Sequence, residues 1–313
     1  MNAETPSPQG KHDTFQLRAE DGASIHVYRW LPHGEVRAVV QIAHGMAEHA
    51  ARYGRLAEAL TQAGYAVYAD DHRGHGKTAA PADLGHYADQ NGWSLVLSDL
   101  RALSKRAKEE HPGKKLVLFG HSMGSFFAQQ LLQKHADELD GLVLSGTNAP
   151  GSILERLGIG VAKLERARKG PRGTSRLLTF LSFGSFNDAF KPTRTEFDWL
   201  SKDHAEVDQY IADPLCGFPC TTQLWVDLLE GLQAIATSGF GGVRKDFPVY
   251  LFAGDKDPVS RGGKGVTELH ERLVSAGLQR ATIRLYPGGR HEMLNETNRD
   301  EVMRDVIAFL DTV

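Results

Sequence analysis

Short apolar runs alternate with stripes of apolar residues at helical spacing along most of the chain. The runs have strand length and are nearly continuous, as expected for strands buried on both faces of a sheet. They cover residues 38–43, 65–69, 116–119, 142–144, 249–253 and 282–286. Between the second and third runs, Trp93, Val96 and Leu100 recur at the spacing of one helix face. This alternation predicts a parallel sheet with helices on both faces.

The chain opens with two further strand-like segments, residues 14–19 and 24–30. Asp21-Gly22 joins them, and Asp-Gly between alternating segments is a hairpin signal. We therefore expect an antiparallel pair ahead of the parallel strands, and about eight strands in all. Residues 1–12 are polar, contain prolines and lack the basic and apolar regions of a secretory signal, so they are predicted to form a disordered lead.

Residues 148–243 interrupt this rhythm. The segment lies between two expected strands and holds 7 of the 14 phenylalanines, together with Trp199 and Trp225. Pro150-Gly151 near its start is a loop signal, and so is the glycine-rich stretch 239–242 near its end. Because the segment is far longer than an ordinary loop, we predict a helical cap, inserted into an α/β core that consists of residues 13–147 and 244–313.

Composition and charge narrow the classes of function. The chain is 41% hydrophobic and 24% charged with a net charge of −3, which argues against a protein that binds nucleic acid through phosphate attraction. No apolar run approaches the roughly 18 residues of a membrane-spanning helix. Cys216 and Cys220 can form neither a disulfide framework nor a metal site by themselves. These features predict a cytoplasmic protein without a bound metal.

The sequence Gly120-His121-Ser122-Met123-Gly124 directly follows the run 116–119 and precedes a helical segment. A G-x-S-x-G motif between a strand and a helix is typical of a nucleophile elbow, a tight turn that raises the serine above the sheet. Open α/β sheets bind their ligands at this carboxyl edge. Ser122 is therefore the candidate nucleophile, and His121 is expected to be a packing and hydrogen-bonding residue.

A serine nucleophile needs a base and an acid that orients the base. His291 follows the last strand and precedes the last helix, again at the carboxyl edge. Asp255 and Asp257 both follow the run 249–253, which gives the chain order serine, acid, histidine. The pattern scarcely separates the two aspartates, although Pro258 stiffens the loop beside Asp257 and favours it.

Several motifs together resemble one family. Residues 44–53 are similar to the H-G-x-x-E-H-x-x-R-Y signature of the monoacylglycerol lipase and lysophospholipase group, also called serine aminopeptidase-like hydrolases. Residues 71–76 match the D-x-R-G-H-G loop of that group, and residues 213–215 match a cap motif. The resemblance extends over about residues 14–312. It implies an α/β-hydrolase fold with an inserted helical cap, and it places the acid at Asp257.

The resemblance also implies roles for residues near the serine. The backbone N–H groups of Met46 and Met123 would form the oxyanion hole, which suits their positions after a strand and at a helix start. Glu48 and Arg52 would orient the polar head of a substrate. The alternative is that these two residues form an ion pair that only shapes the loop.

The cap carries two apolar stripes. One contains Phe180 and Phe183, followed by Phe186 and Phe190, and the other contains Leu154 and Leu157 among basic residues. Packing of the cap against the core explains both stripes. They would equally suit an acyl-chain channel that includes Phe180 and Phe183, and a basic amphipathic surface in transient contact with anionic lipid, with the protein peripheral to the membrane.

The main hypothesis is a serine esterase that cleaves monoacylglycerols, lysophospholipids or similar single-chain lipid esters through an acyl-enzyme. No cofactor is required, and no oligomeric state is predicted. A small-ester carboxylesterase or an acyltransferase would use the same Ser122, His291 and Asp257. A ligand-binding protein that has kept the fold without turnover is the alternative of another class, because a fold does not fix a function.

Overall fold

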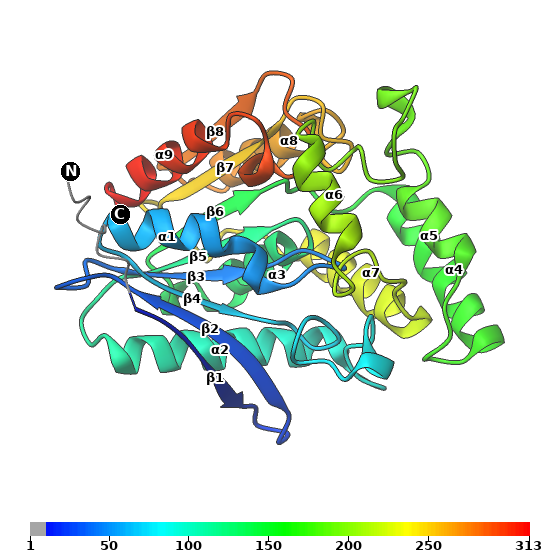
Figure 1. The fold of residues 1–313 in the computed structure, drawn as a ribbon, viewed down its shortest axis with the longest axis horizontal. Coiled ribbons are helices and arrows are strands. Elements are labelled where there is room, and N and C mark those ends of the chain that lie inside the picture. Colours follow the sequence, from blue (N-terminus) through cyan, green and yellow to red (C-terminus); the bar gives the residue numbers. More distant parts are fainter. Residues whose placement is uncertain (1–10) are drawn as a thin grey trace, which may run out of the picture.

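An eight-stranded sheet organises the part of the chain that the computed structural model describes, residues 11–313 (Figure 1). Its strand order is β1-β2-β4-β3-β5-β6-β7-β8. β1 and β2 are antiparallel, as are β2 and β4, whereas all other neighbouring pairs are parallel. The strands are β1 (Lys11–Arg18), β2 (Ser24–Leu31), β3 (Val39–Ala43), β4 (Ala66–Asp70), β5 (Leu116–His121), β6 (Gly141–Ser145), β7 (Val249–Gly254) and β8 (Ala281–Tyr286). The predicted fold class is thereby confirmed.

Helices cover both faces of the sheet because its central strands are apolar on both sides. Every residue of β3 to β7 is buried. Successive side chains of a strand point to opposite faces, so Val39 and Val40 belong to two different core clusters. The cluster of Val40 includes α1 (Gly54–Gln62) and α9 (Arg299–Leu310), and the cluster of Val39 includes α2 (Gly92–Glu110), α3 (Met123–His135) and α8 (Lys264–Ser275).

Four short 3-10 turns lie between the helices and strands of the core, and the first strand begins before the predicted end of the lead at residue 12. The turns are η1 (Ala50–Tyr53), η2 (Pro81–Asp83), η3 (Ala136–Glu138) and η5 (Met293–Asn295). Residues 1–10 of the predicted lead lie outside the described residues. The last two residues of that lead, Lys11 and His12, belong to β1 and pair with Leu31 and Trp30.

The segment 148–243 connects β6 to β7 and is mostly helical. It contains α4 (Ile153–Lys169), α5 (Arg176–Phe183), η4 (Asp188–Phe190), α6 (His204–Ala212) and α7 (Thr222–Thr237). Helix α7 joins the core cluster through residues such as Leu224 and Leu228, and α4 lies against α7. Figure 1 shows these helices gathered at the end of the sheet where the parallel strands finish.

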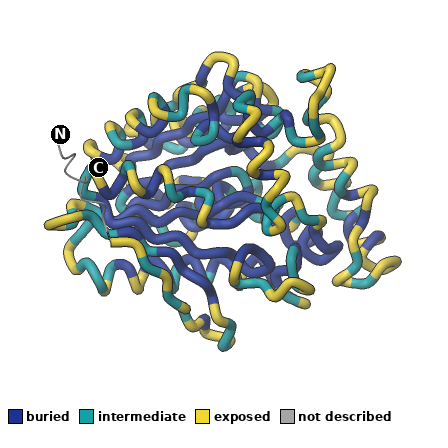
Figure 2. Tube along the Cα trace, in the orientation of Figure 1, coloured by how far each residue is buried: buried dark blue, intermediate teal, exposed yellow. Residues whose placement is uncertain are grey.

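Helices α4 and α5 leave large apolar side chains in solvent. Ile153, Leu154, Leu157 and Leu164 of α4 are exposed, as is Phe180 of α5. Figure 2 shows this outer region in the colours of exposed and half-buried residues, in contrast to the buried strands. No helix among residues 11–313 is both long and apolar enough to cross a membrane.

Candidate active site

Ser122 lies on a strained turn between β5 and α3. Its backbone φ of 50° and ψ of −119° fall in a region that residues other than glycine rarely adopt. Gly120 and Gly124 flank it because neither position has room for a side chain. A Cβ at Gly120 would lie 2.6 Å from the carbonyl oxygen of Gly124, and a Cβ at Gly124 would overlap Ala43 of β3. This crowded turn holds Ser122 at the carboxyl end of β5.

His291 and Asp257 meet at the same edge of the sheet, although 34 residues separate them in sequence. Asp257 follows β7 and His291 follows β8. The Nδ1 atom of His291 lies 3.0 Å from Oδ1 of Asp257, and both residues are buried. The same Oδ1 accepts a hydrogen bond of 2.9 Å from the backbone N–H of Val259, which fixes the carboxylate in its loop. This geometry suits a base held by an acid.

Carboxylates control the charge of His291. Burial disfavours its protonated form, but the carboxylate of Asp257 opposes this effect through its charge and its hydrogen bond, and the charges of Glu292 and Glu48 add to it. As a result, the pKa of His291 is raised above the ordinary value. An imidazolium formed at this position is therefore stabilised, which is the property required of a general base in acyl transfer.

Asp255, the other candidate acid, has a different environment. Its Oδ1 atom accepts a hydrogen bond of 2.7 Å from the backbone N–H of Gly288 and lies 3.7 Å from Nζ of Lys256. The carboxylate is only half-buried and steadies the turn that follows β8. The structure therefore brings Asp257 to His291, and gives Asp255 a local structural contact.

The two residues predicted to form an oxyanion hole approach Ser122 from different elements. Met123 is the first residue of α3, where backbone N–H groups have no partner within the helix. Met46 lies on the loop after β3 and lines the same cavity as Ser122. The neighbouring Gly45 packs closely on the serine, because a Cβ built there would lie 3.3 Å from Cβ of Ser122. The two N–H groups remain a predicted oxyanion hole.

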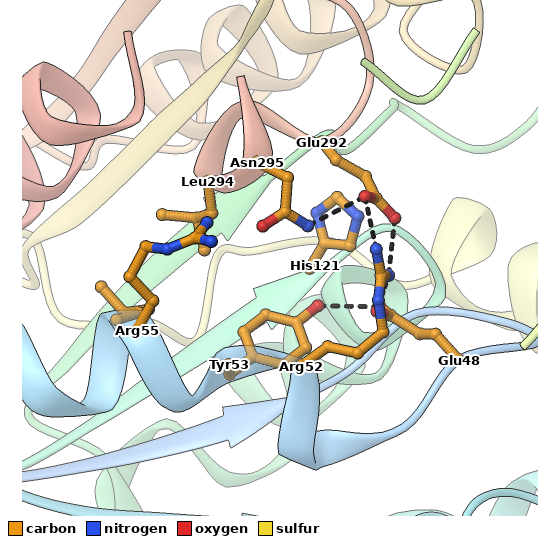
Figure 3. Close-up of a pocket in the computed structure, with 9 residues that line it drawn as sticks. Glu48, Arg52, Tyr53, Arg55, His121, Glu292, Leu294 and Asn295 are labelled. Atoms are coloured by element: carbon orange, nitrogen blue, oxygen red, sulfur yellow. Dashed lines mark hydrogen bonds and ion pairs between the residues drawn. The ribbon is translucent and has the colours of Figure 1, made fainter. Parts of the chain in front are cut away.

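Glu48 and Arg52 belong to a buried cluster of charges, shown in Figure 3. The Nη1 atom of Arg52 lies 2.6 Å from Glu48, and its two Nη atoms each lie 2.7 Å from the carboxylate of Glu292. Glu48 also accepts a hydrogen bond of 2.6 Å from the backbone N–H of Gly45 and one of 2.8 Å from the hydroxyl of Tyr53. The cluster thus ties the loop that follows β3 to the loop that carries His291.

This cluster bears on the role expected for Glu48 and Arg52. The guanidinium of Arg52 is engaged by two carboxylates, which corresponds to the alternative of an ion pair that shapes the loop. Burial opposes ionisation of Glu292, but Arg52 outweighs it and lowers the pKa of that carboxyl. Glu48 and Glu292 line the large cavity beside Ser122. The pairing of Glu292 with Arg52 was not predicted from the sequence, although Glu292 directly follows the candidate base His291.

The residues of this cluster also line a small cavity (Figure 3). Its volume of about 20 Å³ has room for a single water molecule. His121 lines it, and the ring of His121 lies 4.8 Å from that of His291. Burial lowers the pKa of His121 to about 4, so its ring is neutral near neutral pH. With its Nδ1 atom 3.1 Å from Oγ of Ser145, His121 has the packing and hydrogen-bonding contacts expected of it.

A large cavity of about 990 Å³ extends from Ser122 and His291 to the segment 148–243, here called the cap segment. Its volume lies at the upper end of the range for small-molecule sites. Aromatic side chains from the cap segment form part of its wall: Phe180, Phe183, Phe197, Trp199, Tyr210, Phe218 and Trp225. Phe180 and Phe183, the two residues predicted to line an acyl-chain channel, line this cavity, and their role in substrate binding stays a prediction. Phe197, Trp199, Phe218 and Trp225 could not be assigned to the cavity from their spacing.

Phe186 and Phe190 have other partners among the described residues. The Phe186 ring packs edge-on against Trp199 at 5.0 Å, and the Phe190 ring lies 4.2 Å beneath the guanidinium of Arg290. Phe186 therefore packs against the lining residues Phe183 and Trp199, whereas Phe190 packs against Arg290, which is not a lining residue.

One group among the described residues has side chains of metal-binding type. Potential ligand atoms of His49, Asp213 and Cys216 lie within 4.8 Å of one another. The Nε2 atom of His49, however, lies 2.9 Å from Oδ2 of Asp213, so these two groups already satisfy each other. Burial also raises the pKa of the Cys216 thiol, and the neutral thiol is a poor metal ligand. These contacts fit a structural hydrogen-bonded group better than a metal centre.

Comparison with known proteins identifies relatives over most of the chain. A model of the family described as serine aminopeptidase, S33, matches residues 34–298. The chain is 29% identical over 286 residues to a monoacylglycerol lipase of Mycolicibacterium smegmatis, and the alignment covers 90% of each chain. It is 26% identical over 293 residues to a monoglyceride lipase of Homo sapiens, with 93% of this chain and 88% of that protein covered.

Solved structures agree with this relationship. A thermostable carboxyl esterase from Bacillus coagulans in complex with glycerol superposes with a TM-score of 0.88 at 30% identity, covering 96% of this chain and 98% of that one. A lipase described as an open form superposes with a TM-score of 0.84, also at 30% identity, covering 96% of this chain and 99% of the other.

Proposed function

Since the chain belongs to the serine aminopeptidase S33 family and is a carboxylic ester hydrolase, we propose that it cleaves the ester bond of single-chain lipids, monoacylglycerols or lysophospholipids, through an acyl-enzyme. One observation carries the proposal. Ser122 on its strained turn and His291 paired with Asp257 open together onto a large cavity that is lined in part by aromatic side chains.

The proposed mechanism assigns one role to each side chain. Ser122 attacks the ester carbonyl while His291 accepts its proton, and Asp257 holds the imidazole in the required tautomer. The backbone N–H groups of Met46 and Met123 would stabilise the negative charge on the carbonyl oxygen. His291 then returns the proton to the departing alcohol. Water enters, loses a proton to His291 and releases the fatty acid from Ser122 by the same route in reverse.

The shape and chemistry of the cavity support a lipid substrate. A volume of about 990 Å³ exceeds what an acetate ester would fill. Phe180, Phe183 and Trp225 offer apolar surface to an acyl chain. We propose that residues 148–243 form a cap domain on a core of residues 13–147 and 244–313, and that the acyl chain lies between cap and core.

The outer surface of the cap would bring the enzyme to its substrate. Leu154 and Leu157 of α4 are exposed by 78% and 64%, and Phe180 of α5 is exposed by 68%. Basic residues such as Arg168 and Lys169 lie in the last turn of α4. An apolar surface with basic neighbours favours transient contact with anionic lipid. Leu154→Asp should weaken sedimentation with phosphatidylglycerol vesicles, whereas Val274→Asp, at an exposed apolar position of α8, should leave it unchanged.

A series of acyl-chain lengths tests the substrate class. We would measure kcat/KM for p-nitrophenyl esters and monoacylglycerols from acetate upward. Each added methylene buried in the cavity can contribute up to about 0.8 kcal/mol, so kcat/KM should rise over several carbons and then level off. If acetate is the best substrate and each added carbon lowers kcat/KM, the enzyme is a small-ester carboxylesterase.

The same assay separates the remaining alternatives. Adding alcohol acceptors and measuring new ester against free acid distinguishes an acyltransferase from a hydrolase. A burst of p-nitrophenol without steady turnover would point to a ligand-binding protein, because deacylation would then be missing.

A further inference from the structure

A short piece of the cap segment runs alongside the loop that carries His291. We call residues 198–202 the strap; it lies between η4 and α6. The backbone N–H of His291 donates a hydrogen bond of 3.3 Å to the carbonyl of Trp199, and the backbone N–H of Glu292 donates one of 2.8 Å to the carbonyl of Leu200. The catalytic loop of the core is therefore paired, main chain to main chain, with the cap segment.

Side chains reinforce this pairing on both sides. The guanidinium of Arg290 donates to the carbonyl oxygens of Asp198 and Ser201, the latter at 3.1 Å. The hydroxyl of Ser201 donates a hydrogen bond of 2.8 Å to the carbonyl of Asn295, and Ser201 is buried. These hydrogen bonds fix the strap relative to the loop that carries His291, because breaking them would leave polar groups unpaired.

Trp199 connects the strap to both the base and the cavity. Its ring lies 5.1 Å from the ring of His291, inclined by 37°, and 6.1 Å from the ring of Phe183, inclined by 18°. Asp257 holds the Nδ1 edge of the His291 ring. Trp199 contacts the ring of the imidazole and so restrains its tilt. Because Trp199 also lines the large cavity, one side chain touches the base and the space for the acyl chain.

We propose that Trp199 is a positioning residue for His291, and that the strap makes the cap part of the support of the base rather than only a cover over the substrate. This inference rests on the proposed function, because it assigns Trp199 a role in the same reaction. A role in positioning His291 has a consequence that a role in lining the pocket would not have. Loss of the Trp199 ring should slow the turnover of an acetate ester, which leaves most of the cavity empty.

The test compares two tryptophans of the same cavity. Trp225 lines the same cavity and its ring packs on Phe183 at 5.7 Å, whereas the ring contact with His291 is made by Trp199. We would measure kcat and KM of Trp199→Leu and Trp225→Leu on p-nitrophenyl acetate and decanoate. Trp199→Leu should lower kcat by about tenfold or more on both esters, because small displacements of a catalytic group are costly. Trp225→Leu should act mainly on kcat/KM of the decanoate.

Two further readouts separate positioning from general damage. Trp199→Phe retains an aromatic face and should recover most of the acetate kcat. In Trp199→Leu, water reaches His291 and relieves the burial that disfavours its protonated form, while the facing groups Asp257, Glu48, Glu292 and His121 stay in place. The acid limb of kcat/KM should therefore move to higher pH in this variant.

The inference is overturned if Trp199→Leu loses less than about threefold in acetate kcat, or if its losses follow the chain-length pattern of Trp225→Leu. If Trp199→Leu does not fold, Ser201→Ala decides the question, since it removes a strap contact outside the cavity. A lower acetate kcat at unchanged KM supports the strap, and an unchanged kcat refutes it. Wild-type turnover in the same assay tests the proposed function separately, because absence of wild-type ester hydrolysis would contradict that function.

Discussion

Replacing Arg52 by methionine should destabilise the protein strongly. The side chains of Arg52, Glu48 and Glu292 are exposed by only 13%, 4% and 7%, and the guanidinium is within 2.7 Å of both carboxylates. Methionine would leave two buried carboxylates without their cation. Removing one partner of a buried ion pair costs about 3–5 kcal/mol. With an unfolding entropy of about 2.1 cal/mol/K per residue, this corresponds to a fall of about 5–8 °C in Tm for a chain of this length.

The dependence of this loss on pH provides a sharper test. In the wild type, Arg52 lowers the pKa of Glu292, so this carboxylate stabilises the fold above its unfolded-state pKa, and the contribution is lost as pH falls through the folded-state pKa. Without Arg52, burial would raise the pKa of Glu292, and protonation would then relieve the unpaired charge. The Tm difference between Arg52→Met and wild type should therefore be larger at pH 8 than at pH 5.

Thermal unfolding of three variants would measure these effects. Arg52→Lys keeps the charge but not the two-pronged contact and should lose less than Arg52→Met. The double variant Arg52→Met with Glu292→Gln should recover part of the loss, because one unpaired charge is removed with its partner. A Tm of Arg52→Met within about 2 °C of wild type at pH 8 would show that the buried cluster is not a major source of stability.

Three further outcomes follow from the site. Asp257→Asn should lower kcat by about 10⁴-fold by favouring the wrong tautomer of His291, and Asp255→Asn should stay within about tenfold of wild type; the reverse ranking in steady-state assays would show that the acid is misassigned. The acid limb of a kcat/KM profile should lie above the value of about 6.5 for an ordinary histidine, because the pKa of His291 is raised, and a limb below that value would contradict the effect of the surrounding carboxylates. Gly45→Ala should lose most of its esterase activity, since a Cβ would lie 2.7 Å from Oε1 of Glu48 and push the loop away from the serine; full activity would mean that this loop does not need its present position.

Much of the fold could be predicted because the central strands are buried on both faces. Their side chains are nearly all apolar, and the carboxyl ends of parallel strands share one edge, so Ser122 and His291 are both expected at that edge. The boundary errors are small and local. The predicted lead, for example, extended to residue 12, whereas Lys11 and His12 already pair with β2.

The choice between Asp255 and Asp257 could not be made from sequence patterns alone. Both follow β7, and periodicity cannot tell which carboxylate turns inward. Only the backbone of the loop decides it, by directing Asp257 to His291 and Asp255 to the turn at Gly288.

Contacts between distant segments could not be predicted from the sequence for a similar reason. Glu292 pairs with Arg52 across 240 residues, and Trp199 reaches His291 from the cap segment. Neither contact has a spacing that could reveal it, since each depends on how the cap segment and two loops lie on the finished sheet. Sequence patterns therefore predict candidate reacting side chains more readily than the residues that hold them in place.

Mass spectrometry of a trapped acyl-enzyme tests the central claim most directly. Wild-type protein mixed with a long-chain p-nitrophenyl ester and quenched in acid within the first turnovers should carry one acyl group, located on the peptide that contains Ser122. Ser122→Ala should show no adduct and should lose essentially all turnover, since removing a triad nucleophile costs about 10⁶-fold. An acyl group found on another residue, or substantial turnover retained by Ser122→Ala, would contradict the account.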